Sequence, residues 1–188
     1  MKIALLGYGR MGKEIEKIAI SRGHEIVIKK DAGDIVDIKL ADVAIDFSIP
    51  SSAFENITDS MKNQVPVVCG TTGWLDKYEE AISFCKENNS AFLYASNFSL
   101  GVNIFFELNK QLAKLMSGVE DYTIEMEEIH HTKKLDAPSG TAITIAEGII
   151  ENTAKEDWEL GDKAADENIP IVAKRIQDVP GTHTVWYN

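Results

Sequence analysis

The sequence predicts an α/β protein, with a helix-covered parallel sheet followed by a smaller α+β domain. Short apolar runs alternate with amphipathic segments over the first half of the chain, and a glycine-rich turn follows the first run. After residue 118 the pattern changes to a strand-like alternation of apolar and polar residues. Apolar strands that alternate with helices form parallel sheets covered on both faces. Because crossovers are right-handed, the first part is expected to be a Rossmann-type, doubly wound sheet.

Each expected element of the first part follows from its local pattern. The expected strands are residues 2–6, 25–29, 43–47, 65–69 and 91–95. The expected helices are residues 10–21, a helix capped by Ser51 or Ser52, and residues 75–87. A longer helix is expected over residues 100–116, with Ile104, Leu108, Leu112 and Leu115 on one stripe.

The second part begins with a strand that has one solvated face. Tyr122, Ile124 and Met126 alternate with polar residues. A helix from Gly140 to Ile150, an acidic loop, and strands over residues 171–176 and 182–187 are expected to follow. The expected domains are therefore residues 1–98 and 99–188.

The composition excludes several classes of function. With 30 acidic and 19 basic residues the formal net charge is -11, which argues against nucleic acid and anionic membranes as partners. Cys69 and Cys85 lack CxxC spacing and are interpreted as buried thiols of a reducing compartment. No apolar run approaches the ~20 residues of a membrane span, and the opening apolar run is too short for a signal peptide. We expect a cytoplasmic protein.

The first candidate site is the turn from Gly7 to Gly12, which fits G-x-G-x-x-G between a strand and a helix. The first glycine permits the tight turn, the second lets the backbone approach a pyrophosphate, and the third lets helix and strand pack closely. The phosphates then lie at the helix N-terminus. This context predicts dinucleotide binding by residues 1–98, and the alternative is a purely structural turn.

The choice between NADH and NADPH stays open. Asp31 lies roughly 20 positions beyond the turn, where an acidic residue contacts ribose hydroxyls in NAD-binding proteins. Lys29 and Lys30 precede it, and a lysine there can pair with the extra phosphate of NADP. The alternative is that all three are solvated loop charges.

Polar loops follow three further strands, at the carboxyl edge where ligands of open parallel sheets bind. They begin at Asp46, Gly70 and Ala95. The candidate cofactor-binding residues are Gly7, Tyr8, Gly9, Arg10, Met11, Gly12, Lys30, Asp31, Phe47, Ser48, Gly70, Thr71, Thr72, Ala95, Ser96, Asn97 and Phe98.

The second candidate site is the segment from Glu128 to Thr141, which is rich in histidine and lysine. His130 and His131 point to opposite faces of a strand, so no metal site is expected. His130 shares the parity of the apolar residues, and its unperturbed pKa of ~6.5 suits a general acid. Lys134 is close enough to enter the same cleft, whereas Lys133 is interpreted as a surface charge.

A helix start completes this second site. Ser139 is a capping candidate, and the N–H groups of Gly140 and Thr141 form an expected carboxylate site. An anion site beside a cation and a proton donor implies a carboxylate-bearing substrate. With a nicotinamide cofactor, NADH or NADPH, this implies hydride transfer completed by protonation.

These motifs resemble those of the dihydrodipicolinate reductase family. The matching segments are Gly7–Gly12, Asp46–Ser48, Gly70–Gly73, Ala95–Ser99, Glu128–Ala142 and the Gly-Thr-His-Thr-Val run that contains His183. The resemblance implies reduction of a cyclic dicarboxylate, 4-hydroxy-tetrahydrodipicolinate, with loss of water, in the diaminopimelate route to lysine.

The resemblance also implies roles and assembly. His130 and Lys134 match the catalytic proton-transfer residues, and His131, Gly140 and Thr141 match substrate contacts. It implies a homotetramer built through the second domain, which also binds substrate, and a further C-terminal part of the family fold. The alternatives are another amino-acid-pathway dehydrogenase, and a non-catalytic dinucleotide-binding relative or truncated inactive form.

Overall fold

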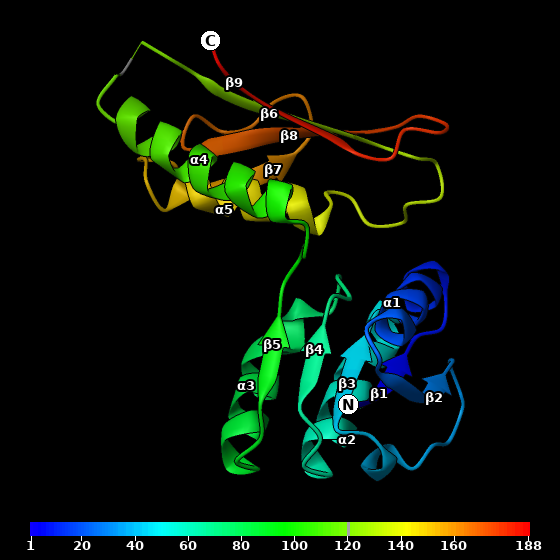
Figure 1. The fold of residues 1–188 in the computed structure, drawn as a ribbon. Coiled ribbons are helices and arrows are strands. Elements are labelled where there is room, and N and C mark those ends of the chain that lie inside the picture. Colours follow the sequence, from blue (N-terminus) through cyan, green and yellow to red (C-terminus); the bar gives the residue numbers. More distant parts are fainter. Residues whose placement is uncertain (120) are drawn as a thin grey trace. The chain divides into compact units, whose positions relative to one another are not determined.

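The computed structural model describes residues 1–119 and 121–188. It divides into two compact units, Met1–Ser96 and Asn97–Asn188, each built around its own sheet (Figure 1).

Unit 1 holds a five-stranded parallel sheet. Its strands are β1 (Lys2–Leu6), β2 (Glu25–Lys30), β3 (Val43–Asp46), β4 (Val67–Cys69) and β5 (Phe92–Tyr94). Their spatial order is β2-β1-β3-β4-β5, and every neighbouring pair is parallel. The chain first runs to one side of β1 and then to the other, which is a doubly wound sheet with its switch point between β1 and β3. The predicted fold class is confirmed.

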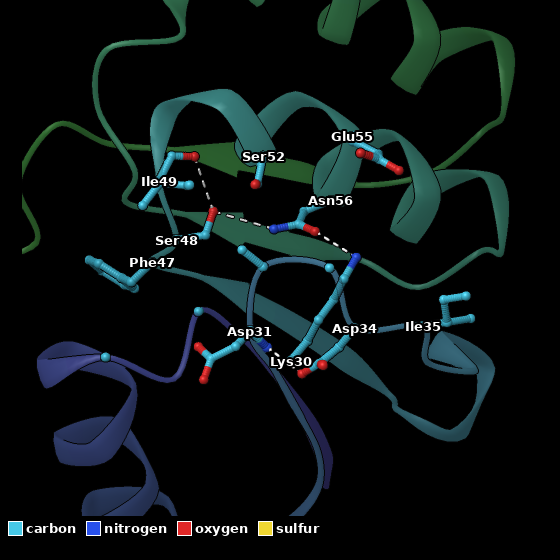
Figure 2. A pocket seen from close by; sticks show the side chains of 14 residues that line it. Lys30, Asp31, Asp34, Ile35, Phe47, Ser48, Ile49, Ser52, Glu55 and Asn56 are labelled. Carbon is cyan, nitrogen blue, oxygen red and sulfur yellow. Dashed lines mark hydrogen bonds between the residues drawn. The ribbon is translucent and has the colours of Figure 1, made fainter.

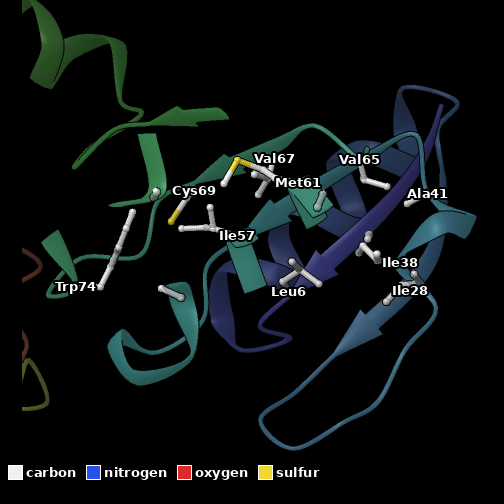
Figure 3. Close-up of a cluster of buried hydrophobic side chains, with 14 residues drawn as sticks. Leu6, Ile28, Ile38, Ala41, Ile57, Met61, Val65, Val67, Cys69 and Trp74 are labelled. Atoms are coloured by element: carbon white, nitrogen blue, oxygen red, sulfur yellow. The ribbon is translucent and has the colours of Figure 1, made fainter. Parts of the chain in front are cut away.

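Helices cover both faces of this sheet. They are α1 (Arg10–Ser21), α2 (Pro50–Lys62) and α3 (Tyr78–Glu87), with short 3-10 turns η1 (Ile38–Leu40) and η2 (Leu75–Lys77). Successive strand residues point to opposite faces, so Ile3 and Leu5 pack with Ala19 of α1. Leu6 instead joins the larger cluster around Ile57 of α2 (Figure 3).

Two local predictions for unit 1 are wrong. Neither Ser51 nor Ser52 caps α2, because the helix already begins at Pro50. Proline suits the first helical position, where its fixed φ is preorganised and no N–H is needed. The predicted helix over residues 75–87 begins with the 3-10 turn η2, and only the residues from Tyr78 onward are α-helical.

Unit 2 combines a mixed four-stranded sheet with two helices. Its elements are α4 (Leu100–Met116), β6 (Ile124–His130), α5 (Gly140–Ile150), β7 (Asp157–Leu160), β8 (Asn168–Arg175) and β9 (Thr182–Tyr187). The strand order is β7-β8-β6-β9, with only β9 antiparallel to its neighbour. Strand β7 lies in the segment predicted to be an acidic loop. That prediction is wrong because Trp158, between two acidic residues, packs against the core.

The buried face of β6 leads from the core to the candidate site. Ile124 and Met126 pack with residues of α5, and Glu128 and His130 follow on the same face. The predicted alternation is confirmed, except that Tyr122 precedes the strand and is half exposed.

The apolar stripe predicted on α4 lies at the surface of unit 2. Ile104, Leu108 and Leu115 are exposed, whereas Asn109 and Ala113 are the buried residues of this helix. Within residues 1–119 and 121–188, no helix has the length and apolar character that crossing a membrane requires.

Candidate active site

The three glycines of the first turn have different surroundings. Gly7 has φ +94°, and a Cβ there would lie 2.3 Å from the carbonyl oxygen of Phe47. A Cβ on Gly12 would lie 2.4 Å from the carbonyl oxygen of Gly7, so this glycine lets α1 pack closely on β1. A Cβ on Gly9 would meet nothing within 4 Å, and Gly9 caps α1 without a side-chain hydrogen bond. The open backbone and uncapped helix start therefore fit a cofactor pyrophosphate.

A pocket of about 360 Å³ opens beside this turn (Figure 2). The predicted cofactor residues that line it are Gly7, Gly9, Lys30, Asp31, Phe47 and Ser48. The remaining lining residues are Ala32, Gly33, Asp34, Ile35, Ile49, Ser52, Glu55 and Asn56, none of which was predicted to bind. The predicted residues of unit 1 outside this lining are Tyr8, Arg10, Met11, Gly12, Gly70, Thr71, Thr72, Ala95 and Ser96. Asn97 and Phe98 belong to unit 2.

Lysine and aspartate side chains at the end of β2 line the pocket. Lys30 Nζ donates to Oδ1 of Asn56 at 2.8 Å (Figure 2). Asp31 Oδ1 accepts from the backbone N–H of Tyr8 at 3.0 Å, and Asp34 accepts from the backbone N–H of Asp31 at 2.9 Å. The pocket thus presents one ammonium group and carboxylates at the place where the adenosine ribose is expected.

The neighbouring lysine is held elsewhere. Lys29 Nζ lies 2.6 Å from a carboxylate oxygen of Glu16 and 4.8 Å from the ring centroid of Tyr8. The hydroxyl of Tyr8 also donates to Glu16. Of the two lysines considered from sequence, only Lys30 therefore lines the pocket.

A buried carboxylate joins the loops after β3 and β4. Asp46 is fully buried and accepts from the hydroxyls of Ser48 and Thr71 at 3.2 and 3.0 Å. It also accepts from Nδ2 of Asn56 at 3.1 Å. Burial raises its pKa, although these hydrogen bonds oppose the shift. Thr71 does not line the pocket, but it is tied through Asp46 to residues that do.

In unit 2, strand register brings distant side chains to the end of β6. His130 pairs with Arg175 of the parallel strand β8, and Glu128 pairs with His183 of the antiparallel strand β9. Sequence reasoning assigned no role to Glu128, Arg175 or His183. The parity that Glu128 shares with His130 was the available signal, whereas the other two depend on pairing across the sheet.

Glu128 is the centre of this cluster and is fully buried. Its Oε2 accepts from the backbone N–H of Ser139 at 3.0 Å and lies 3.3 Å from Nδ1 of His130. Its Oε1 accepts from Nη2 of Arg175 at 3.1 Å, and Nε2 of His183 lies 3.8 Å from Oε2. Burial opposes ionisation of Glu128, but the hydrogen bonds from Ser139 and Arg175 outweigh burial and hold its pKa below the ordinary value.

Both histidines of the cluster have lowered pKa values. Burial is the main cause for His130, and Lys134 and Arg175 add to it while Glu128 opposes it. Burial, together with His130 and Lys134, lowers the pKa of His183 to about 4. Both rings are therefore predominantly neutral at pH 7.

The predicted proton donor Lys134 is anchored beside this cluster. Its Nζ donates to both carboxylate oxygens of Asp136 at 2.8 and 2.9 Å, and the backbone carbonyl of Asp136 accepts from Arg175. Lys133 is exposed. His131 is partly buried, and its Nδ1 has no hydrogen-bond partner among residues 1–119 and 121–188.

The start of α5 faces the same group of side chains. Ser139 Oγ accepts from the N–H of the third helical residue at 3.1 Å, so the predicted cap is confirmed. The same Oγ lies 3.1 Å from Nε2 of His183. The N–H groups of Gly140 and Thr141 belong to the first turn and have no acceptor within the helix. Asn97 Nδ2 donates to Thr141 Oγ1 at 3.3 Å, which joins a predicted cofactor residue to a predicted substrate residue.

Metal binding is one further possibility for this cluster. Glu128, His130 and His183 bring ligand atoms within 4.8 Å of one another. Both oxygens of Glu128 already accept N–H groups, from Ser139 and Arg175, and the positive charge of Arg175 disfavours a second cation there. The sequence expectation of no metal site remains a prediction.

The sequence matches two family descriptions that together cover most of the chain. Residues 21–98 match "Dihydrodipicolinate reductase, N-terminus", and residues 101–188 match "Dihydrodipicolinate reductase, C-terminus". The chain belongs to the dihydrodipicolinate reductase family. The resemblance found from the motifs is confirmed, and the family's N-terminal domain implies a nicotinamide cofactor.

Individual dihydrodipicolinate reductase relatives agree with this assignment. A protein of Christiangramia forsetii named 4-hydroxy-tetrahydrodipicolinate reductase is 58% identical over 192 residues, covering 100% of this chain and 80% of that protein. One of the same name from Methanoregula boonei is 35% identical over 170 residues, 88% of this chain and 65% of its own length. The solved structure of a dipicolinate-bound dihydrodipicolinate reductase from Paenisporosarcina shares the fold, with a TM-score of 0.67 at 24% identity over 100% of this chain and 83% of that one. The chain is an oxidoreductase, and a non-catalytic relative is not favoured.

Proposed function

We propose that this chain reduces 4-hydroxy-tetrahydrodipicolinate to tetrahydrodipicolinate, with loss of water, in the diaminopimelate route of lysine biosynthesis. One observation carries the proposal: the cap of α5, Ser139, donates to the same carboxylate oxygen of Glu128 that lies 3.3 Å from His130, and Lys134 is near enough to lower the pKa of that histidine. An anion site next to two proton-transfer groups suits a dicarboxylate that is protonated as it is reduced.

The charges of the site favour a proton donor, His130, that becomes protonated only when substrate is bound. One substrate carboxylate binds the helix start at Gly140 and Thr141, and Lys134 balances the charge of the second, which His131 contacts. The pKa of His130 is low in the free protein because of burial and nearby cations. A bound dianion raises that pKa, so the ring accepts a proton when substrate is present. When bound, the nicotinamide would supply the hydride, and His130 and Lys134 are the two groups available to deliver the one proton that the reduction consumes.

The test follows oxidation of NADH and NADPH with freshly made 4-hydroxy-tetrahydrodipicolinate. We expect kcat/KM to fall about 10²- to 10⁴-fold in His130→Ala and in Lys134→Ala, because each loses a proton-transfer group. Lys133→Ala is the matched control, since Lys133 is the exposed neighbour, and we expect wild-type turnover from it. Wild-type turnover in both His130→Ala and Lys134→Ala contradicts the proposal.

We propose that both NADH and NADPH serve as cofactors. Lys30 and Asp31 both line the pocket, which supports pairing of Lys30 with the extra phosphate of NADPH and acceptance by Asp31 from the ribose hydroxyls of NADH. We expect Lys30→Ala to raise the KM for NADPH about fivefold to tenfold, as for one partly exposed ion pair worth about 1 kcal/mol, and to leave the KM for NADH nearly unchanged. Lys29→Ala, whose ammonium is held by Glu16, is the control. An equal change for both cofactors rules out this role of Lys30.

We also propose that unit 1 carries the cofactor and that unit 2 carries the substrate and the contacts of a homotetramer in the cytoplasm. The family resemblance supports the tetramer, and the two cysteines without disulfide spacing support a reducing compartment. Light scattering on the purified protein measures the assembly directly.

A further inference from the structure

Glu128 occupies a position where the pattern of β6 calls for an apolar residue. It follows Ile124 and Met126 on the buried face, and no part of its side chain reaches solvent. A buried carboxylate is destabilising unless it is paired and hydrogen-bonded. Its presence in this row therefore points to a role that a leucine or isoleucine cannot fill.

The contacts of Glu128 link the two groups to which the proposed function assigns proton transfer. On one side Oε2 lies 3.3 Å from Nδ1 of His130. On the other side Arg175 donates both to Oε1 of Glu128 and to the backbone carbonyl of Asp136, whose carboxylate holds Lys134. A continuous series of contacts therefore connects His130 to Lys134 through Glu128, Arg175 and Asp136.

The two nitrogens of the His130 ring have different surroundings. Nδ1 is buried and lies 3.3 Å from the carboxylate, and it makes no hydrogen bond of good geometry to any described residue, so the carboxylate is the nearby acceptor toward which a small rotation of the ring would turn it. Nε2 lies next to Gly181, where an added Cβ would be 3.0 Å away, so the glycine leaves this side of the ring free of a side chain. A carboxylate that accepts from one ring nitrogen fixes the tautomer and leaves the other nitrogen for chemistry.

From this geometry we propose that Glu128 is a positioning residue for the reduction: it accepts a hydrogen bond from Nδ1 of His130 and so makes Nε2 the proton-transferring nitrogen. The same carboxylate accepts from the backbone N–H of Ser139 and thereby fixes the start of α5, where the substrate carboxylate binds. Glu128 acts through His130 and the helix start without touching substrate. The inference deepens the proposed function and rests on it.

The charged and titratable groups around His130 come from every element that packs against it. Glu128 lies on its own strand, Lys134 and Asp136 on the following loop, Arg175 on β8 and His183 on β9. Of the two acidic groups, Glu128 alone is within hydrogen-bonding reach of the ring in the described structure. A change at Glu128 therefore alters the ring's orientation directly.

The first experiment measures the tautomer and needs no turnover. In ¹⁵N-histidine-labelled protein, NMR at neutral pH is expected to show His130 protonated at Nδ1, with its signals assigned through His130→Ala. A neutral ring protonated at Nε2 overturns the proposal. Because this readout is independent of substrate, a protein with the expected tautomer but no reductase activity would contradict the proposed function and leave the positioning of His130 standing.

The second experiment compares Glu128→Gln with Glu125→Gln, which is the same change on the exposed face of the same strand. We expect Glu128→Gln to lower kcat about 100-fold, to change KM less than about threefold, and to shift the pH profile of kcat, because a neutral amide no longer fixes the charged ring. Glu128→Asp, which keeps the charge, is expected to have a kcat between those of Glu128→Gln and the wild type. Glu125→Gln is expected to have the kcat of the wild type. An unchanged kcat and pH profile in folded Glu128→Gln overturns the proposal. If that variant does not fold, the tautomer in the wild type decides.

Discussion

Among the residues that the structure describes, each unit buries one carboxylate fully near the carboxyl end of a strand, and the two carboxylates have opposite surroundings. Asp46 ends β3, and the donors to its side chain among the described residues are all neutral: two hydroxyls, one amide and the thiol of Cys69. Glu128 lies near the end of β6 and faces the guanidinium of Arg175 and two imidazoles. Burial raises the pKa of Asp46, whereas for Glu128 the hydrogen bonds from Ser139 and Arg175 outweigh burial and lower it.

This difference suggests two roles: Asp46 holds loops together by accepting hydrogen bonds, and Glu128 acts through its negative charge. Neutral donors hold Asp46 as an acceptor that ties two loops together. The lowered pKa of Glu128 favours its charged form, which can orient a histidine and balance a cation. The predictions below, from the largest expected effect to the smallest, test whether the charge matters in one unit only.

The largest effect is expected from Arg175→Met, which leaves the buried carboxylate of Glu128 without its cation. Breaking a buried ion pair from one side costs about 3 to 5 kcal/mol, and the partial exposure of Arg175 places this variant near the lower figure. Urea unfolding monitored at Trp158 of unit 2 measures the loss. Lys174→Met, the adjacent residue whose exposed ammonium pairs with Glu127, should cost less than about 1 kcal/mol. Equal losses in the two variants would mean that the Glu128 pair is no different from a surface pair.

A smaller effect is expected at Asp46, because its partners are neutral. Asp46→Ala leaves the buried amide of Asn56 and hydroxyl of Thr71 without their acceptor, at about 2 kcal/mol, whereas Asp46→Asn keeps one acceptor oxygen and should cost about 1 kcal/mol. Both should also weaken NADH binding in a fluorescence titration, since the loop after β3 lines the pocket. Asp42→Asn is the exposed control. A loss in Asp46→Asn as large as that in Arg175→Met would show that the charge of Asp46 does matter.

The smallest effect is expected in the pH dependence of stability. His183 has a folded pKa of about 4 and an unfolded value of ~6.5, so the unfolded chain takes up the proton first. The contribution of neutral His183 to the free energy of unfolding is complete above pH 6.5 and is lost as the pH falls towards 4. After allowing for the partial exposure of the ring, this loss is roughly 1 to 2 kcal/mol. The lowered pKa of Glu128 acts in the same direction below pH 4.5, and the raised pKa of Asp46 acts in the opposite direction. Urea unfolding at pH 7 and pH 5 should show a smaller difference in His183→Gln than in the wild type. An equal difference in both proteins counts against this contribution.

Local patterns were enough to predict most of the architecture. Strand and helix periodicity predicted the parallel sheet, and strand parity placed His130 on the buried face of β6. The surroundings of Gly7, Gly9 and Gly12 agree with what the fingerprint requires of each position. Strand β7 was not predicted, because its two apolar residues stand among acidic ones and only one of them, Trp158, packs on the core.

The residues of the candidate substrate site in unit 2 could be predicted only where they are close in sequence. The run from His130 to Thr141 lies on consecutive elements, so its side chains were found together. Arg175 and His183 reach the site through the pairing of β8 and β9 with β6, and register over such distances is not a local property of the sequence. The roles of the cofactor and substrate residues remain predictions until the variants above are measured.

One consequence of the Asp46 network concerns the cysteine beside it. Burial raises the pKa of Cys69 to about 12, and its sulfur lies 3.6 Å from Oδ2 of Asp46. Alkylating reagents attack thiolates, so Cys69 should react only when this part of unit 1 opens, while the partly buried Cys85 reacts sooner. The rate of Cys69 alkylation, measured by mass spectrometry, therefore reports how often the loops around Asp46 open locally. A bound dinucleotide should lower that rate.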